Sequence, residues 1–122
     1  MSKSTRLTAR LKRKKRVGKR LHGTADKPRL TVFRSHRYIY AQLVDDDEGK
    51  TLASCSVSKA GDCKLPEGFD GKRASAYKVG HALAEVAKAQ GVAKVIFDRN
   101  GYLYHGRIAA LAQGARDGGL EF

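Results

Sequence analysis

The apolar and polar positions alternate with a period of two in three short segments, beginning near residue 29. Such alternation is typical of strands that bury one face. It predicts strands over residues 29–34, 38–44 and 51–57. The polar connections between them are short, so we expect an antiparallel meander.

A helical period follows further along the chain. Apolar residues within 74–90 recur at spacings of three and four, and Gly91 supplies a stop signal. The apolar run 92–97 predicts a buried strand, and a last helix should begin near Ile108 and end before Gly118. A strand, a long helix and a strand in succession imply a right-handed crossover. The predicted fold is therefore α/β, with packed helices and a mixed sheet. That sheet combines a three-stranded antiparallel meander with one strand added through the helical crossover.

The first third of the chain lacks a regular apolar pattern. Residues 5–21 could form a helix, but its three leucines give only a sparse apolar stripe and Gly18 weakens it. We expect this segment to be frayed or disordered when free and helical against a partner. The predicted organisation is a basic N-terminal arm, residues 1–25, and a single α/β globular domain, residues 26–122.

Charge separates these two parts even more sharply. Residues 1–37 hold fourteen Lys or Arg and one acid, a net charge of +13, whereas residues 38–122 hold eleven bases and eleven acids. Within 10–20, eight of eleven residues are Lys or Arg. Like charges on neighbouring helical turns repel, so this density favours a polyanionic partner. Nucleic acid, an anionic membrane surface and a solvated tail or localisation tag are the alternatives.

Other features narrow the classes of function. No apolar run approaches the roughly 20 residues of a membrane span, and the apolar stripe of the arm is too thin for firm insertion into a membrane surface. We expect no secretory signal, because no apolar segment follows the basic N-terminus; a transit peptide remains an alternative. Cys55 should be a core residue and Cys63 a free thiol in a polar loop, without a disulfide or a metal site.

Two segments of the predicted domain mix cationic and aromatic residues. Residues 33–40 place Arg and His among aromatic residues around a turn, and residues 98–107 form a loop rich in Arg, Tyr, His and Gly. Guanidinium groups suit phosphates, and exposed rings can stack on unpaired bases. An enzyme acting on nucleic acid, using Asp98 and His105, is an alternative, but no nucleophile is paired with them. The acidic turn 45–49 departs from a calcium loop at its glycine and closing glutamate positions.

At this level of detail the chain resembles the L18 family of bacterial large-subunit ribosomal proteins. The matching motifs cover nearly the whole chain. They are the basic arm, Gly23–Leu30, Val32–Ser35, Ile39–Gln42, Thr51–Ser54, Phe97–Arg107 and Gly119–Phe122. Asn100 stands where the family pattern suggests a second glycine.

The resemblance implies an α/β sandwich that binds 5S rRNA and helps to attach it to 23S rRNA in the central protuberance. It also implies neighbouring ribosomal proteins as partners, the cytoplasmic ribosome as location, and no catalytic centre, cofactor, metal, membrane or small-molecule substrate. The expected arm contacts with RNA are Arg10, Lys12, Arg13, Lys14, Lys15, Arg16, Lys19 and Arg20. The candidates on the domain are Arg29, Arg34, His36, Arg37, Tyr38, Arg99, Tyr102, Tyr104, His105 and Arg107.

Overall fold

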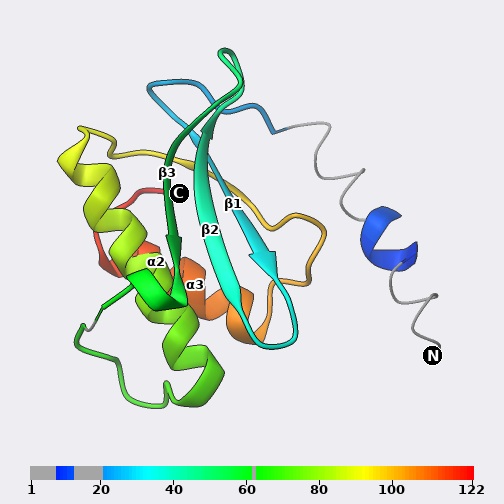
Figure 1. Ribbon diagram of the computed structural model, residues 1–122, viewed down its shortest axis with the longest axis vertical. Coiled ribbons are helices and arrows are strands. Elements are labelled where there is room, and N and C mark those ends of the chain that lie inside the picture. The colour runs from blue at the N-terminus through cyan, green and yellow to red at the C-terminus, as the bar shows by residue number, and fades with distance from the viewer. Residues whose placement is uncertain (1–7, 13–20, 62) are drawn as a thin grey trace.

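A four-stranded mixed sheet forms one layer of the protein (Figure 1). The computed structural model describes residues 8–12, 21–61 and 63–122. The strands lie in the order β3-β2-β1-β4; β1 pairs antiparallel with β2, β2 antiparallel with β3, and β4 parallel with β1. Their bounds are Arg29–Arg34 for β1, Ile39–Asp45 for β2, Lys50–Ser56 for β3 and Ile96–Asp98 for β4. The predicted mixed sheet is thus confirmed.

The second layer consists of the helices α2 (Gly71–Ala89) and α3 (Gly106–Asp117), which pack on the same face of the sheet (Figure 1). A single 3-10 turn, η1 (Val57–Lys59), leads out of β3. α2 connects β3 with β4 at the opposite edge of the sheet, so the crossover passes beneath β2 and β1. Among the residues that the structure describes, no helix has both the length and the apolar character to cross a membrane.

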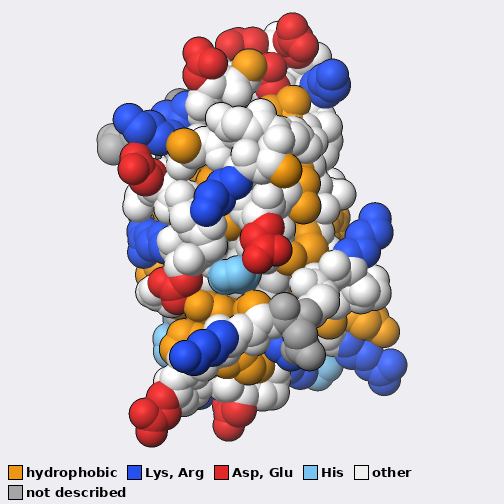
Figure 2. All heavy atoms as spheres, turned by 90° about the vertical axis from the view of Figure 1, so that its left-hand side faces the viewer, with side chains coloured by type: hydrophobic (Ala, Val, Ile, Leu, Met, Phe, Trp, Pro, Cys, Tyr) orange, Lys and Arg blue, Asp and Glu red, His pale blue; other side chains and the backbone are white. Residues whose placement is uncertain are grey.

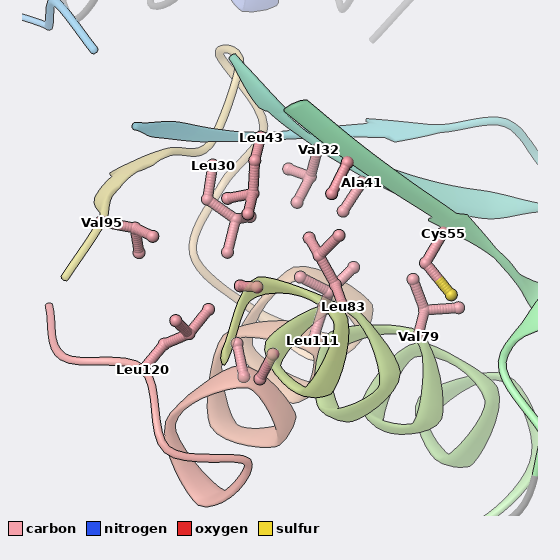
Figure 3. Packing of buried hydrophobic residues seen from close by; sticks show 14 of the residues in the cluster. Leu30, Val32, Ala41, Leu43, Cys55, Val79, Leu83, Val95, Leu111 and Leu120 are labelled. Atoms are coloured by element: carbon pink, nitrogen blue, oxygen red, sulfur yellow. The ribbon is translucent and has the colours of Figure 1, made fainter. Parts of the chain in front are cut away.

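The core lies between the sheet and the two helices (Figure 3). Leu30 and Leu43 point from the strands towards Leu83 of α2 and Leu111 of α3, and all four are fully buried. Cys55 also joins this cluster, as the sequence predicts. Burial of each such leucine is worth about 2 kcal/mol relative to exposure.

Two glycines let the helices approach closely. A methyl group at Gly80 of α2 would collide with the backbone carbonyl of Leu111, and one at Gly114 of α3 would collide with that of Tyr77. The apolar pattern predicts both helices, but this contact depends on the absence of side chains.

The strand predicted over 92–97 is wrong in extent. Val92 and Val95 are buried as expected, but the ladder with β1 covers only Ile96–Asp98. Pro28 ends the ladder at this side, since it has no N–H and serves only as an acceptor for the amide of Ile96. Lys94 instead forms an isolated parallel bridge with Glu121 near the C-terminus.

The bounds of four other predicted elements need correction. α2 begins at Gly71, three residues before the predicted start, because Asp70 in extended conformation marks the beginning of the helix. β2 and β3 are each displaced by one residue from their predicted bounds. Of the helix predicted over 5–21, residues 8–12 are helical and Leu21 is not; the remainder lies outside the described residues.

Candidate nucleic-acid interface

Within residues 8–12 of the arm, a cation contacts the domain. The guanidinium of Arg10 lies 4.2 Å from the centroid of the Tyr102 ring, within the range of a cation–π interaction. Lys12 is exposed. The remaining predicted arm contacts, namely Arg13, Lys14, Lys15, Arg16, Lys19 and Arg20, lie outside the described residues.

The chain is fixed to the β2–β3 turn where it enters the domain. The amide of Gly23 donates to Oδ2 of Asp46 at 2.7 Å, and the amide of Asp46 donates to the carbonyl of Gly23 at 2.9 Å. His22 also pairs with Asp47 at 2.6 Å, and this carboxylate raises the pKa of the imidazole. Gly23 is buried, and a side chain there would collide with Arg29 and Val44. The root of the arm is therefore held in place.

Arg29 supports this root from β1. Its Nε and Nη2 donate to the two oxygens of Asp46 at 2.9 and 3.0 Å, and its Nη1 donates to Asp98 at 2.7 Å. The hydrogen bonds from Arg29 lower the pKa of the Asp46 carboxyl from 3.8 to about 2. Because two carboxylates occupy this guanidinium, the geometry gives Arg29 a structural role, and its predicted RNA contact stays a prediction.

The two cationic–aromatic segments of the sequence meet in space. The Tyr102 hydroxyl accepts a hydrogen bond from the Arg34 amide at 3.2 Å and donates one to the Arg34 carbonyl at 3.0 Å. The Arg34 guanidinium lies 5.2 Å from the Tyr102 ring, which Arg10 also contacts. Arg107 donates to the carbonyls of Ser35 at 2.9 Å and His36 at 3.4 Å. The β1–β2 turn, the 98–107 loop and the arm thus form one surface.

Lys72 belongs to the same surface and was missed from the sequence. Its Nζ donates to the His36 carbonyl at 2.9 Å, so α2 and α3 both hold the β1–β2 turn through cations. A helix predicted to begin at residue 71 would have placed Lys72 in its first turn, but the predicted helix began at residue 74. His36, Arg37 and Tyr38 are exposed on this turn, and the Tyr38 side chain is 65% exposed.

The cations of this surface have no acidic partner in the part of the chain that the structure describes. Among the described residues, no carboxylate lies within ion-pair distance of Arg34, Arg37, Lys72 or Arg107. Two effects lower the pKa of Arg107. The larger is the burial of its guanidinium, and the smaller is the nearby positive charge of Arg34. The opposite end of the sheet carries the acidic β2–β3 turn, residues 45–48 (Figure 1). On the α2 side, acidic and basic side chains are interspersed (Figure 2). We call the surface formed by Arg10, Arg34, His36, Arg37, Lys72, Tyr102 and Arg107 the basic surface.

Tyr104 lies in a different cluster from Tyr102. Its ring meets Phe97 edge-on at 6.1 Å, and its hydroxyl accepts a hydrogen bond from Arg116 at 3.3 Å. Arg116 also covers Phe122, so this tyrosine packs near the C-terminus. Of the other predicted site residues, His105 is exposed at the start of α3 and Arg99 is half-buried.

The conformation of Asn100 is compatible with asparagine where the family pattern suggests a glycine. Its φ of 55° lies in the left-handed region, which Asn tolerates better than most residues. Its side chain donates to the Val32 carbonyl at 3.1 Å, and its amide donates to Asp98 at 2.9 Å. Within the described residues, no hydrogen bond joins Asp98 to His105, the pair on which the enzyme alternative rested.

The acidic turn and the cysteines form no ligand set for a metal. The described residues contain no group of three or more His, Cys, Asp and Glu side chains that could hold an ion. Asp45 instead accepts the amides of Asp47 and Glu48, which closes the turn.

Comparison with known proteins identifies the family. A profile described as ribosomal L18 of archaea, bacteria, mitochondria and chloroplast matches residues 4–122. Large ribosomal subunit protein uL18 of Symbiobacterium thermophilum is 52% identical over 122 residues, covering 100% of this chain and 99% of its own. The uL18 proteins of Desulfatibacillum aliphaticivorans and Myxococcus xanthus are each 54% identical. These alignments cover 91% and 97% of this chain, and 90% and 98% of the relatives.

The matched proteins are structural constituents of the large ribosomal subunit and not enzymes, so ribosomal RNA and ribosomal proteins are the partners that this relationship implies. The sequence resemblance is confirmed over almost the entire length. The chain belongs to the ribosomal L18 family, whose members are large-subunit proteins of the uL18 type.

Proposed function

We propose that this chain binds 5S rRNA and helps to attach it to 23S rRNA in the central protuberance of the large subunit. The observation that carries the proposal is the basic surface, where cations from three separate segments converge without a described acidic partner. Phosphates would supply the missing negative charge. The family membership supports ribosomal RNA as their source.

The division of labour follows from the distribution of charge. The arm holds most of the excess charge, so it should supply most of the electrostatic attraction. The basic surface should fix the orientation, because hydrogen bonds hold its turn and loop in one arrangement. We propose that the boundary between the arm and the domain lies near residue 25.

A salt titration of binding to transcribed 5S rRNA tests the proposal. If about eight phosphates are neutralised, the logarithm of affinity should fall against the logarithm of salt with a slope near −7. Replacing both Arg13 and Lys14 by Gln should make this slope shallower by about 2. Charge replacement is a sharper test than truncation, because it leaves Gly23 bound to Asp46.

The matched control removes the same charge elsewhere. The double variant Lys88→Gln, Lys94→Gln removes two positive charges outside the basic surface. It should leave the slope of the salt titration unchanged. Transfer RNA serves as the competitor of comparable charge. Equal affinity for both RNAs would reject the 5S assignment, and a salt-insensitive complex would reject the electrostatic role of the arm.

A further inference from the structure

The face of the sheet that the helices leave uncovered carries an aromatic pair. Phe33 of β1 and Tyr40 of β2 are cross-strand partners, and their rings stack with centroids 4.9 Å apart and planes inclined by 13°. Tyr40 is 39% exposed, although the residues on either side of it in β2 are fully buried. An exposed ring on a rigid strand is an available stacking surface.

The strand register shows which side of the Tyr40 ring is open. Phe33 covers the side towards β1, and Ser56 is the partner of Tyr40 on β3. Serine is too short to cover a ring. Among the ring contacts of the described residues, Tyr40 has only the one with Phe33. Its second face therefore looks over Ser56 towards the edge of the sheet.

Polar groups border this open face. Gln42 and Ser54 are the next cross-strand pair on the same side of the sheet, and Ser54 is exposed. The Ser56 hydroxyl lies 3.1 Å from that of Ser58. Amides and hydroxyls both donate and accept hydrogen bonds, which suits the mixed edges of a nucleobase.

A cation follows the same position along the chain. Lys59 ends η1 three residues beyond Ser56. A nucleotide whose base lay against Tyr40 would have this positive charge nearby for its phosphate. Aromatic stacking with adjacent cations is how proteins bind bases that are not paired in a duplex.

We propose that the free face of Tyr40, above Ser56, binds one unstacked nucleobase from a loop or bulge of the RNA. This inference rests on the proposed RNA-binding function and adds a base-recognition site that is separate from the phosphate contacts. The partner class is an unpaired nucleotide in folded RNA. Duplex RNA alone cannot occupy the site, because its bases are already stacked.

The absence of tryptophan from this chain permits a direct optical test. In a Tyr40→Trp variant the indole is the only tryptophan, and a base stacked on it should quench its fluorescence. We expect saturating 5S rRNA to quench at least half of this emission. Val86→Trp is the matched control, because Val86 is 41% exposed and lies on α2, on the other side of the sheet. Equal quenching in both variants would overturn the proposal.

Affinity measurements provide the second test. Tyr40→Ala should weaken binding to 5S rRNA about 5- to 100-fold, as for the loss of one stacked base, while Tyr40→Phe should stay within about twofold of the wild type. Ser56→Tyr should also weaken binding, because the new ring would occupy the free face of Tyr40. This substitution suits a strand and leaves the core untouched. Wild-type affinity in both Tyr40→Ala and Ser56→Tyr would overturn the site.

The salt dependence separates this inference from the proposed function. Stacking involves no counterion release, so the slope of the salt titration should be the same in Tyr40→Ala and in the wild type. If the wild type binds with a steep slope but Tyr40→Trp is not quenched, the base site fails and the proposed function stands. If the wild type does not bind 5S rRNA at all, both fail.

Discussion

Tyr102 and Arg34 are 68 residues apart in the sequence, yet one phenol hydroxyl bonds to both the amide and the carbonyl of the arginine. The same ring lies beneath the Arg10 guanidinium of the arm. A single aromatic residue thus connects the arm, the end of β1 and the loop after β4. The basic surface depends on this connection, because no element of the sheet alone would bring these cations together.

Removing the hydroxyl should loosen the connection and keep the ring. Tyr102→Phe should lower the free energy of unfolding by about 1 kcal/mol, because two hydrogen bonds to Arg34 are lost at a partly exposed site. Urea unfolding measures the difference. Tyr38→Phe removes an exposed hydroxyl that has no hydrogen-bond partner among the described residues, and should change stability by less than about 0.5 kcal/mol. Equal effects of the two substitutions would contradict the proposed role of Tyr102.

The Arg29–Asp46 pair should make stability depend on pH in the acidic range. Because the folded-state pKa of Asp46 is about 2, below its ordinary 3.8, the ionised carboxyl stabilises the folded state. This contribution is fully present above about pH 4.5 and is lost as the pH falls towards 2. After allowance for partial exposure of the pair, we expect it to be on the order of 1–2 kcal/mol.

Urea unfolding of the wild type and Asp46→Asn at pH 5.5 and pH 2.5 measures this contribution. The difference in stability between the two proteins should be large at the higher pH and should shrink at the lower one. In an Arg29→Gln background the same substitution should give a much smaller change with pH. A difference that stays constant between the two pH values would show that the pair does not stabilise the fold through ionised Asp46.

The left-handed conformation of Asn100 predicts an unusual order of substitutions. Asn100→Ala should destabilise the fold more than Asn100→Gly, by about 1 kcal/mol, because glycine adopts a φ of 55° without strain. Both variants lose the bond from the side chain to the Val32 carbonyl. Thermal unfolding in parallel checks the order. Alanine equal to or better than glycine would mean that the side-chain bond, rather than the backbone conformation, dominates at this position.

The sequence predicted the layers well because the patterns that form them are local. The alternation around Leu30 and the helical spacing around Leu83 each describe an element and its buried face, and both residues are in the core. The short β4 was less predictable. Val92 and Val95 are buried members of the core cluster, and burial alone does not show where a ladder with β1 ends.

The candidate site was predictable only as separate pieces. The residue types of the 33–40 and 98–107 segments indicated RNA contacts, but the bond from Arg107 to Ser35 depends on how α3 meets the sheet. Likewise, the sequence alone does not distinguish Arg29 from Arg34, because both are arginines of the same predicted strand. The Arg29 guanidinium pairs with Asp46 and Asp98, and that relationship exists only in the folded chain.

The separation of charge along the sheet has a consequence for the approach to RNA. Residues 26–37 hold four bases and one acid and residues 38–122 are balanced, so the domain carries a net charge of only +3. Its acidic β2–β3 turn and its cationic β1–β2 turn lie at opposite ends of the strands. In the field of a polyanion, such a body experiences a torque and a net pull much weaker than that on the arm. On the proposed function, the arm would therefore attract the protein to RNA, and the body would turn so that its cationic end arrives first. An encounter in the opposite orientation would bring the acidic turn towards the phosphates and would be electrostatically unfavourable.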